Sequence, residues 1–193
     1  MRLYFARHGQ SVGNKKNLFY GWTDYPLTED GYKQALELGE KLRDIDITTC
    51  YTSPLIRAAE TARISMRGRD VPIITLDGLK EQYMGDLEDT TIEENLVRHP
   101  QLIEDMLSDW TKVAPPGGES YQVLESRVTG CLDKIISRGE NALIVAHNGT
   151  LATMITKLLE APLGAIDRFW LGHGDYSCIS LRDGRVKLIC FNK

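Results

Sequence analysis

Two short apolar runs in this chain each lead directly to a histidine. Residues 2–6 read RLYFA and precede Arg7 and His8, whereas residues 142–146 read ALIVA and precede His147. Uninterrupted apolar runs of this length are typical of strands buried in a parallel sheet. Open α/β sheets bind their ligands at the carboxyl ends of their strands. The two runs therefore predict a site with two histidines at one edge of a sheet.

Strands and helices are expected to alternate along the rest of the chain. Further strands are expected at 45–52, 71–76, 177–181 and 186–191, and helices at 28–43, 54–66, 119–137 and 150–160. Thr28 and Ser53 are the expected capping residues of the first two helices, because their hydroxyls can accept from free backbone N–H groups. Asp183-Gly184 predicts a tight hairpin between the last two strands. This order predicts an α/β fold with a doubly wound, mostly parallel sheet and helices on both faces.

The chain is expected to form a single domain over residues 1–193, because its length suits one domain. The stretch from about 82 to 116 differs in character from the rest. It is polar, favours helices at 92–99 and 101–110, and ends in the sequence PPGG. We interpret it as a small helical cap, inserted in the domain and lying over the site.

Composition excludes several classes of partner. The net charge of −4 gives no basic face, so nucleic-acid binding is not expected. No apolar run approaches the ~20 residues that span a bilayer, and no charged-then-apolar leader opens the chain. A cytoplasmic location without membrane attachment is therefore expected. The four cysteines include no CxxC pair and are expected to be reduced and buried. The sequence does not indicate an oligomeric state.

An anion-binding role is expected around His8. Arg7 precedes it, and a doubly wound sheet brings the helix start that carries Arg57 to the same edge. Cationic neighbours lower a histidine pKa from its reference of about 6.5, so His8 is expected to be neutral and nucleophilic. A phosphate monoester, with about −1.5 to −2 charges at pH 7, matches the arginines. Asn148 and Gly149 open a helix whose backbone N–H groups add further donors.

Phosphoryl transfer to an imidazole also requires a proton donor for the leaving alkoxide. A carboxylic acid can serve when burial or nearby negative charge raises its pKa toward neutrality. Glu81, just after the strand expected at 71–76, is the candidate. Its rivals in the same loop are Asp86, Glu88 and Asp89.

Several ordered sequence blocks run through the chain: Arg7-His8-Gly9-Gln10-Ser11 with Asn14, then residues 19–24 (FYGWTD), 27–31 (LTEDG), 53–62 (SPLIRAAETA), 79–88, 116–120 (PGGES) and 145–147 (VAH). Together these blocks resemble the histidine phosphatase superfamily, in its phosphoglycerate mutase-like branch. A bare Arg-His-Gly is a weak signal, whereas ordered blocks over most of the chain are a strong one. The fold that the resemblance implies is the doubly wound α/β sheet already expected.

The resemblance also implies roles for the matching residues. His8 would be phosphorylated during turnover, and Glu81 falls on the family's acid position. Arg7, Arg57 and His147 would hold the transferring phosphoryl group. The expected substrate-binding residues are Asn14, Tyr20, Gly21, Gln82, Asn148 and Gly149. No metal and no cofactor are implied, and the expected partner is a small phosphorylated metabolite.

The acid block favours a phosphatase over a mutase. In the mutases the block that begins at the acid resembles the pattern Glu-Arg-x-Tyr. In this chain Gln82 and Met84 stand in place of the arginine and the tyrosine. The chain also has a shorter cap and no Arg-Arg pair. We therefore expect a phosphomonoester hydrolase that works through a phosphohistidine on His8. The alternative is cofactor-dependent phosphoglycerate mutase-type phosphoryl transfer, which the mutase-like residues 19–24 favour.

Two other readings of the same residues are open. Two histidines and a glutamate could bind zinc, but Arg7 and Arg57 would repel a metal ion. A catalytically dead phosphoprotein-binding module would lack the nucleophile or the acid, and both are present in this chain. For His99 and His173 the sequence indicates no partner, and the expectation is a helix end and a loop without a role.

Overall fold

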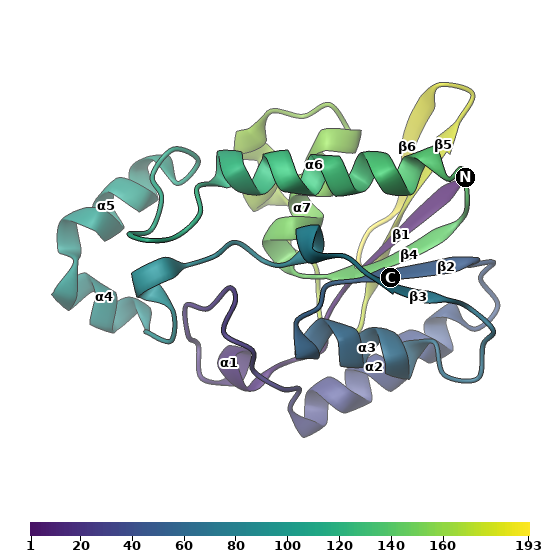
Figure 1. The fold of residues 1–193 in the computed structure, drawn as a ribbon, viewed down its shortest axis with the longest axis horizontal. Helices are drawn as coiled ribbons and strands as arrows, with labels where there is room; N and C mark the ends of the chain where they lie inside the picture. Colours follow the sequence, from purple (N-terminus) through teal and green to yellow (C-terminus); the bar gives the residue numbers. More distant parts are fainter.

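A computed structural model describes the whole chain, residues 1–193, and contains one six-stranded mixed sheet in the order β3-β2-β4-β1-β5-β6 (Figure 1). The strands are β1 (Arg2–Arg7), β2 (Thr49–Thr52), β3 (Ile73–Thr75), β4 (Ala142–Ala146), β5 (Tyr176–Arg182) and β6 (Arg185–Cys190). The first four strands run parallel, and the last two form an antiparallel extension. The doubly wound, mostly parallel α/β fold expected from the sequence is confirmed.

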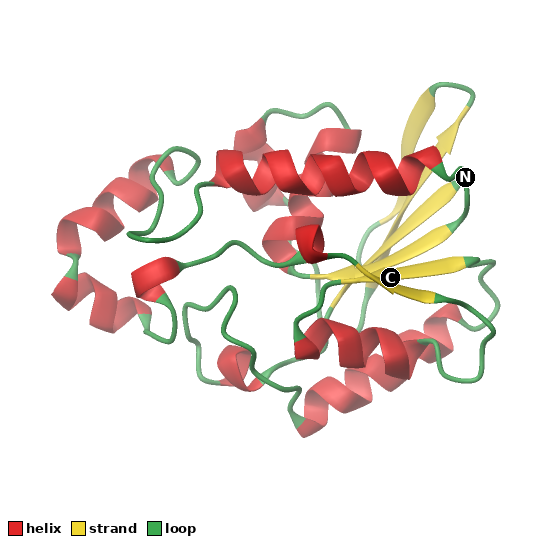
Figure 2. Ribbon diagram, in the orientation of Figure 1, coloured by secondary structure: helices red, strands yellow, loops and turns green.

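Helices follow the parallel strands in turn. They are α1 (Val12–Lys15), α2 (Glu29–Leu42), α3 (Ile56–Ser65), α4 (Ile92–Arg98), α5 (Pro100–Asp109), α6 (Tyr121–Ser137) and α7 (Asn148–Leu158), with short 3₁₀ helices η1 (Asp77–Leu79), η2 (Gly85–Leu87) and η3 (Leu163–Arg168). Figure 2 shows helices on both sides of the strands. None of the helices is both long and apolar enough to cross a membrane.

The side chains of β1 alternate between two cores. Leu3 and Phe5 pack in the core that α6 and α7 cover. Tyr4 and Ala6 pack in the other core, with residues of α2 and α3. Alternate strand residues point to opposite faces, so a strand that is apolar on both faces must be covered on both. This is why residues 3–6 are apolar without interruption.

The pairing of β1 with β4 sets the position of the two histidines. The strands are parallel, and Arg7 lies opposite Ala146. His8 and His147 follow these residues and therefore leave the sheet side by side, at the edge that faces α1, α4 and α5 in Figure 1. The expectation that the two apolar runs deliver their histidines to one sheet edge is confirmed.

Of the two helix caps expected from the sequence, Thr28 is confirmed and Ser53 is not. The Thr28 side chain accepts from the backbone N–H of Gly31 and begins α2, as expected. Ser53 does not cap α3, which begins at Ile56 with Leu55 as its capping residue and no side-chain cap. The Ser53 hydroxyl instead lies 2.8 Å from His147 Nε2. Ser53 therefore combines this tertiary contact with a local one, from the backbone N–H of Leu55 over 3.3 Å.

Three boundaries also differ from expectation. The loop expected from 10 to 26 contains the short helix α1, which a capping box between Ser11 and Asn14 stabilises. The strand expected at 45–52 begins only at Thr49, because Ile45 still belongs to the turn that closes α2. The strand expected at 71–76 is a three-residue edge strand, β3.

The hairpin between β5 and β6 follows its turn residues. Asp183 and Gly184 have φ values of 53° and 69°. Two successive positive φ angles match the twist of antiparallel strands, and glycine tolerates that region without steric cost. The expected hairpin is therefore confirmed.

Candidate active site

The structure fixes the tautomer of His8. Its side chain is buried, and Nδ1 lies 2.7 Å from the backbone carbonyl of Gly9. A carbonyl only accepts, so Nδ1 carries the proton and Nε2 keeps its lone pair. Burial first, and then the charges of Arg57 and Arg7, lower the pKa of His8 well below the ordinary histidine value. A neutral imidazole with a free Nε2 can act as a nucleophile.

His147 lies beside His8, with their ring centroids 5.1 Å apart. Ser53 Oγ accepts from the backbone N–H of Leu55 and lies 2.8 Å from His147 Nε2. Nδ1 of the His147 ring is buried and has no hydrogen-bond partner. Burial and the charge of Arg57 lower the pKa of His147 well below its ordinary value. His147 is therefore neutral at neutral pH and keeps one ring nitrogen for a ligand.

Two buried arginines lie against the histidine pair. Arg7 donates to the carbonyl of Leu171 over 3.2 Å, and its guanidinium lies 4.7 Å from the Trp170 ring. Arg57 is 1% exposed, with its guanidinium 4.7 Å from the Tyr20 ring. Burial lowers the pKa of both guanidinium groups, which remain cations at neutral pH.

The hydrogen bonds of these arginines leave their charges available. Arg57 donates to the carbonyls of Gly21, over 2.6 Å, and Thr23, over 3.0 Å. The Nε atoms of Arg7 and Arg57 are buried without a hydrogen-bond partner. Buried cations are costly without a counter-charge, and a buried donor usually finds an acceptor. The pair therefore favours an anion close to His8.

Glu81 lies just beyond η1, with its carboxylate at the start of α7. The carboxylate accepts from the backbone N–H groups of Gly149 (2.9 Å), Thr150 (3.1 Å) and Gln82 (3.1 Å), and from the Thr150 hydroxyl (3.2 Å). We expected burial or negative neighbours to favour the protonated acid. The structure instead places hydrogen-bond donors around the carboxyl group. These contacts hold Glu81 at the start of α7, next to Gly149.

The rival carboxyls have other positions. Asp86 and Asp89 are exposed. Glu88 accepts from the backbone N–H groups of Gly21, Trp22, Thr23 and Met84. Burial raises the pKa of Glu88, but these backbone hydrogen bonds outweigh burial and hold the pKa below its usual value. Glu88 therefore organises the loop that precedes α2 and is unsuited to donate a proton.

A cavity of about 810 Å³ opens above the histidine pair. Of the residues expected from the sequence, its lining includes Arg7, Asn14, Tyr20, Glu81, Gln82, Asn148 and Gly149. His8, Arg57 and His147 are buried behind this lining. Gly21 is not among the lining residues, and a Cβ there would collide with the Gln82 carbonyl. Gly21 therefore allows a close approach of two backbone segments.

Sequence reasoning missed His173 as a member of the site. Its Nδ1 lies 2.6 Å from the backbone carbonyl of His8, and the two rings are 5.5 Å apart. The side chain also lines the cavity. An isolated bridge between Arg7 and His173 holds the segments together. Only the flanking glycines, Gly172 and Gly174, mark this position in the sequence, and they carry no chemical signal.

The imidazoles of the site should make the fold sensitive to acid. Burial lowers the pKa of His173 to about 4, whereas an unfolded histidine titrates near 6.5. Unfolding therefore takes up a proton below about pH 6.5, and stability falls as the pH falls from there to about 4. From pH 7 to pH 5, His173 alone should remove about 2 kcal/mol from the free energy of unfolding.

Denaturant titrations at both pH values measure this loss. The matched variant His173→Gln should lose about 2 kcal/mol less than the wild type over the same interval, because glutamine does not titrate. His8 and His147 contribute with the same sign in both proteins. An equal loss in both proteins would show that His173 is not held neutral in the folded state.

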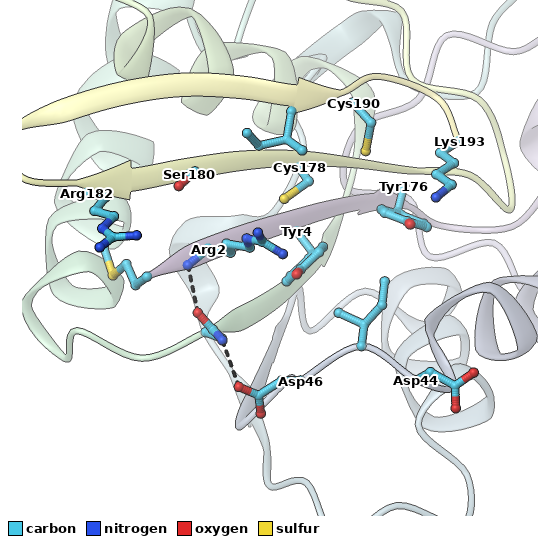
Figure 3. A pocket seen from close by; sticks show the side chains of 14 residues that line it. Arg2, Tyr4, Asp44, Asp46, Tyr176, Cys178, Ser180, Arg182, Cys190 and Lys193 are labelled. Carbon is cyan, nitrogen blue, oxygen red and sulfur yellow. Dashed lines mark hydrogen bonds between the residues drawn. The ribbon is translucent and has the colours of Figure 1, made fainter.

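A second hollow lies at the other end of the sheet, near the start of β1 (Figure 3). Its volume is about 740 Å³, and Arg2, Asn141 and Asp46 form a short hydrogen-bonded chain along one wall. It contains no histidine and none of the residues expected at the site. The chemistry therefore gathers at one end of the sheet only.

The fold and the site together define a class of protein. A doubly wound α/β sheet brings two neutral imidazoles, two buried guanidinium groups and one carboxylate to the carboxyl ends of adjacent strands. Neutral imidazole as nucleophile, fixed cations and a carboxylate for proton transfer are the components of phosphoryl-transfer enzymes.

Known proteins place the chain in a family. The profile of the histidine phosphatase superfamily (branch 1) matches residues 3–193. The adenosylcobalamin/alpha-ribazole phosphatase of Salmonella typhimurium is 34% identical over 194 aligned positions, which cover 100% of this chain and 96% of that protein. A 2,3-bisphosphoglycerate-dependent phosphoglycerate mutase of Parvibaculum lavamentivorans is 37% identical over 168 positions, covering 81% of this chain and 79% of the mutase.

Comparison with a solved structure supports the same family. The crystal structure of the alpha-ribazole phosphatase from Shigella flexneri superposes with a TM-score of 0.95 at 29% identity, covering 100% of this chain and 96% of that one. The chain belongs to the histidine phosphatase superfamily, branch 1. The class of activity expected from the sequence, hydrolysis of a phosphomonoester of a small metabolite, is thereby confirmed at the level of the family.

Proposed function

We propose that the chain hydrolyses phosphomonoesters in two steps through a phosphohistidine on His8. His8 Nε2 attacks phosphorus in line, the bond between phosphorus and the ester oxygen breaks, and Glu81 gives a proton to the departing oxygen. Water then attacks the phosphohistidine, Glu81 takes a proton from it, and orthophosphate leaves with His8 restored. The observation that carries this proposal is the tautomer of His8, whose Nδ1 donates to Gly9 and leaves Nε2 free.

Fixed charges supply the remaining catalysis in this proposal. Arg7, Arg57 and His147 hold the phosphoryl oxygens, because each has a buried side-chain nitrogen without a hydrogen-bond partner. Asn148 and Asn14 lie in the cavity wall beside them. Donors that are already oriented cost no reorganisation when charge develops, so most of the rate enhancement is expected from them.

The walls of the cavity support a particular class of substrate. Aromatic side chains provide much of the lining: Phe19, Tyr20, Trp110, Tyr121 and Trp170. Arg7 is the only arginine or lysine among the lining residues. A second anionic group, such as a carboxylate, would therefore find no cation of its own. We propose an uncharged leaving group with a flat aromatic part, and the candidate substrate is the alpha-ribazole 5′-phosphate for which relatives are named.

The segment from about 82 to 116 is proposed to act as the cap of this cavity. It contributes Gln82, Met84 and Trp110 to the lining. Trp110 packs against Tyr121 at the start of α6, with ring centroids 4.4 Å apart. In this proposal residues 1–193 form one domain, and the cap selects the leaving group while the sheet edge holds the phosphoryl group.

A panel of substrates tests the proposed activity. We expect alpha-ribazole 5′-phosphate to have a kcat/KM at least about tenfold above those of phosphoglycerate, phosphoserine and sugar phosphates, because stacking on aromatic walls adds about 1–3 kcal/mol. Trp110→Ala should lower kcat/KM for this substrate and leave glycerol phosphate nearly unchanged. Leu107→Ala, on the exposed side of α5, is the control.

The same assay separates the phosphatase from the mutase. Both orthophosphate and isomerised product are measured, with phosphoglycerate as substrate and 2,3-bisphosphoglycerate added. We expect orthophosphate only, because a mutase must also hold the second anionic group while the intermediate reorients. Isomerisation faster than phosphate release would overturn the proposal in favour of the mutase.

A further inference from the structure

One partly buried ion pair outside the proposed chemistry contacts the backbone of Glu81. We call residues 81–84, which follow η1, the acid loop. Arg127, on α6, donates from Nη1 to the carbonyls of Gly78 (3.0 Å) and Lys80 (2.7 Å). It also donates from Nη2 to the carbonyl of Glu81 over 2.7 Å. All three acceptors lie within three residues of the proposed acid. The guanidinium therefore holds the backbone that carries Glu81.

Glu119 fixes the guanidinium in turn. Arg127 Nε and Nη2 each lie 2.7 Å from one oxygen of the Glu119 carboxylate, which is a bidentate pair. The two side chains are only 21% and 9% exposed. The same carboxylate accepts from the backbone N–H of Tyr83, and the Glu119 carbonyl accepts from Gln82 Nε2 over 2.7 Å. Bidentate pairs fix geometry as well as adding energy.

Tertiary hydrogen bonds determine the shape of the acid loop. Residues 81–84, between η1 and η2, belong to no helix or strand. The Glu81 carbonyl accepts from Arg127 Nη2 and from Trp22 Nε1 (2.8 Å), so its backbone is held from two sides. In the proposed mechanism the carboxyl group must reach the ester oxygen, and the fixed backbone sets the point from which the side chain extends.

We infer that Arg127, held by Glu119, is a positioning residue for Glu81: it sets the point from which the carboxyl reaches the leaving oxygen. This inference rests on the proposed role of Glu81 as acid. Misplacement of a reacting group by about 1 Å can cost roughly 100-fold in rate. Arg127 donates no hydrogen bond to Arg7, Arg57 or either histidine, so a variant that keeps its charge should impair mainly proton delivery.

A leaving-group comparison tests the inference. The kcat/KM reports steps up to phosphoryl transfer and is measured for p-nitrophenyl phosphate, which needs little protonation, and for glycerol phosphate, which needs it fully. Glu81→Gln serves as the reference and should lower glycerol phosphate turnover by about 10²-fold or more relative to the aryl ester. Arg127→Lys keeps the charge beside Glu119 but loses the planar fork. It should lower the same ratio by roughly tenfold or more.

A second readout separates positioning from general damage. Competitive inhibition by orthophosphate should stay within about twofold of wild type in Arg127→Lys, because Arg7, Arg57 and both histidines are untouched. Arg138→Lys, at the exposed end of the same helix, should change neither quantity. Glu119→Gln weakens the bidentate pair and should lower the ratio in the same direction. It carries the test if Arg127→Lys does not fold.

The outcomes are distinct. Equal losses for both esters in Arg127→Lys, or weakened orthophosphate inhibition, would overturn the positioning role and leave Glu81 as acid. If Glu81→Gln itself shows no leaving-group preference, the acid assignment fails, and with it the basis of the inference. A selective loss in both variants supports both steps.

Discussion

His8→Ala should remove nearly all hydrolysis of p-nitrophenyl phosphate, by roughly 10⁴-fold or more, because losing the nucleophile of a covalent mechanism removes the whole route. The aryl ester is the stringent choice of substrate, since its good leaving group needs no help from Glu81. Water cannot take over easily, because it would have to be positioned and deprotonated at the place that Nε2 occupies. Steady-state assays measure the loss directly.

Two further measurements identify the covalent step. Quenching without acid, followed by phosphorus NMR, should show a phosphohistidine in the wild type and none in the variant. His8→Asn should be equally inactive, although an amide can still donate to the Gly9 carbonyl as Nδ1 does. His99→Ala, at an exposed helix end, should retain full activity. A signal on any residue other than His8, or activity within about tenfold of wild type, would contradict the mechanism.

Much of the fold could be predicted from the local pattern of apolar and capping residues in the sequence. The runs that became β1 and β4 are apolar on both faces, and Thr28 begins α2 through its own hydroxyl. These features depend on neighbours in sequence. The shared edge of His8 and His147 follows from parallel pairing, which such buried runs favour.

What the sequence could not provide depends on tertiary contacts. His173 reaches His8 because β5 returns antiparallel to β1 and an isolated bridge joins His173 to Arg7. Nothing in local spacing encodes that return. Ser53 had the right chemistry for a cap, but His147 offers its hydroxyl a buried partner instead. Glu81 has its particular environment because α7 begins beside it.

Arg57→Ala should lower kcat/KM for phosphomonoesters by about 10²-fold or more, because it removes a desolvated charge aimed at a developing phosphoryl transition state. Lys80→Ala should change it by less than about threefold. The Lys80 ammonium pairs with exposed Asp77 over 3.3 Å and lies 4.8 Å from the Trp22 ring, outside the cavity. Exposed pairs of this kind contribute only about 0–1 kcal/mol. The kcat/KM of both variants is measured with p-nitrophenyl phosphate and compared with that of the wild type.

Arg57 also donates to the carbonyls of Gly21 and Thr23, so its loss could act by displacing that loop. Chemical rescue separates charge from shape. Added guanidinium ions can enter the space that the side chain leaves and should restore part of the activity of Arg57→Ala, whereas sodium ions at the same concentration should not. Orthophosphate inhibition should weaken in Arg57→Ala and stay normal in Lys80→Ala. Comparable losses in the two variants would show that phosphoryl binding does not depend on the buried guanidinium, and the electrostatic account of the site would have to be abandoned.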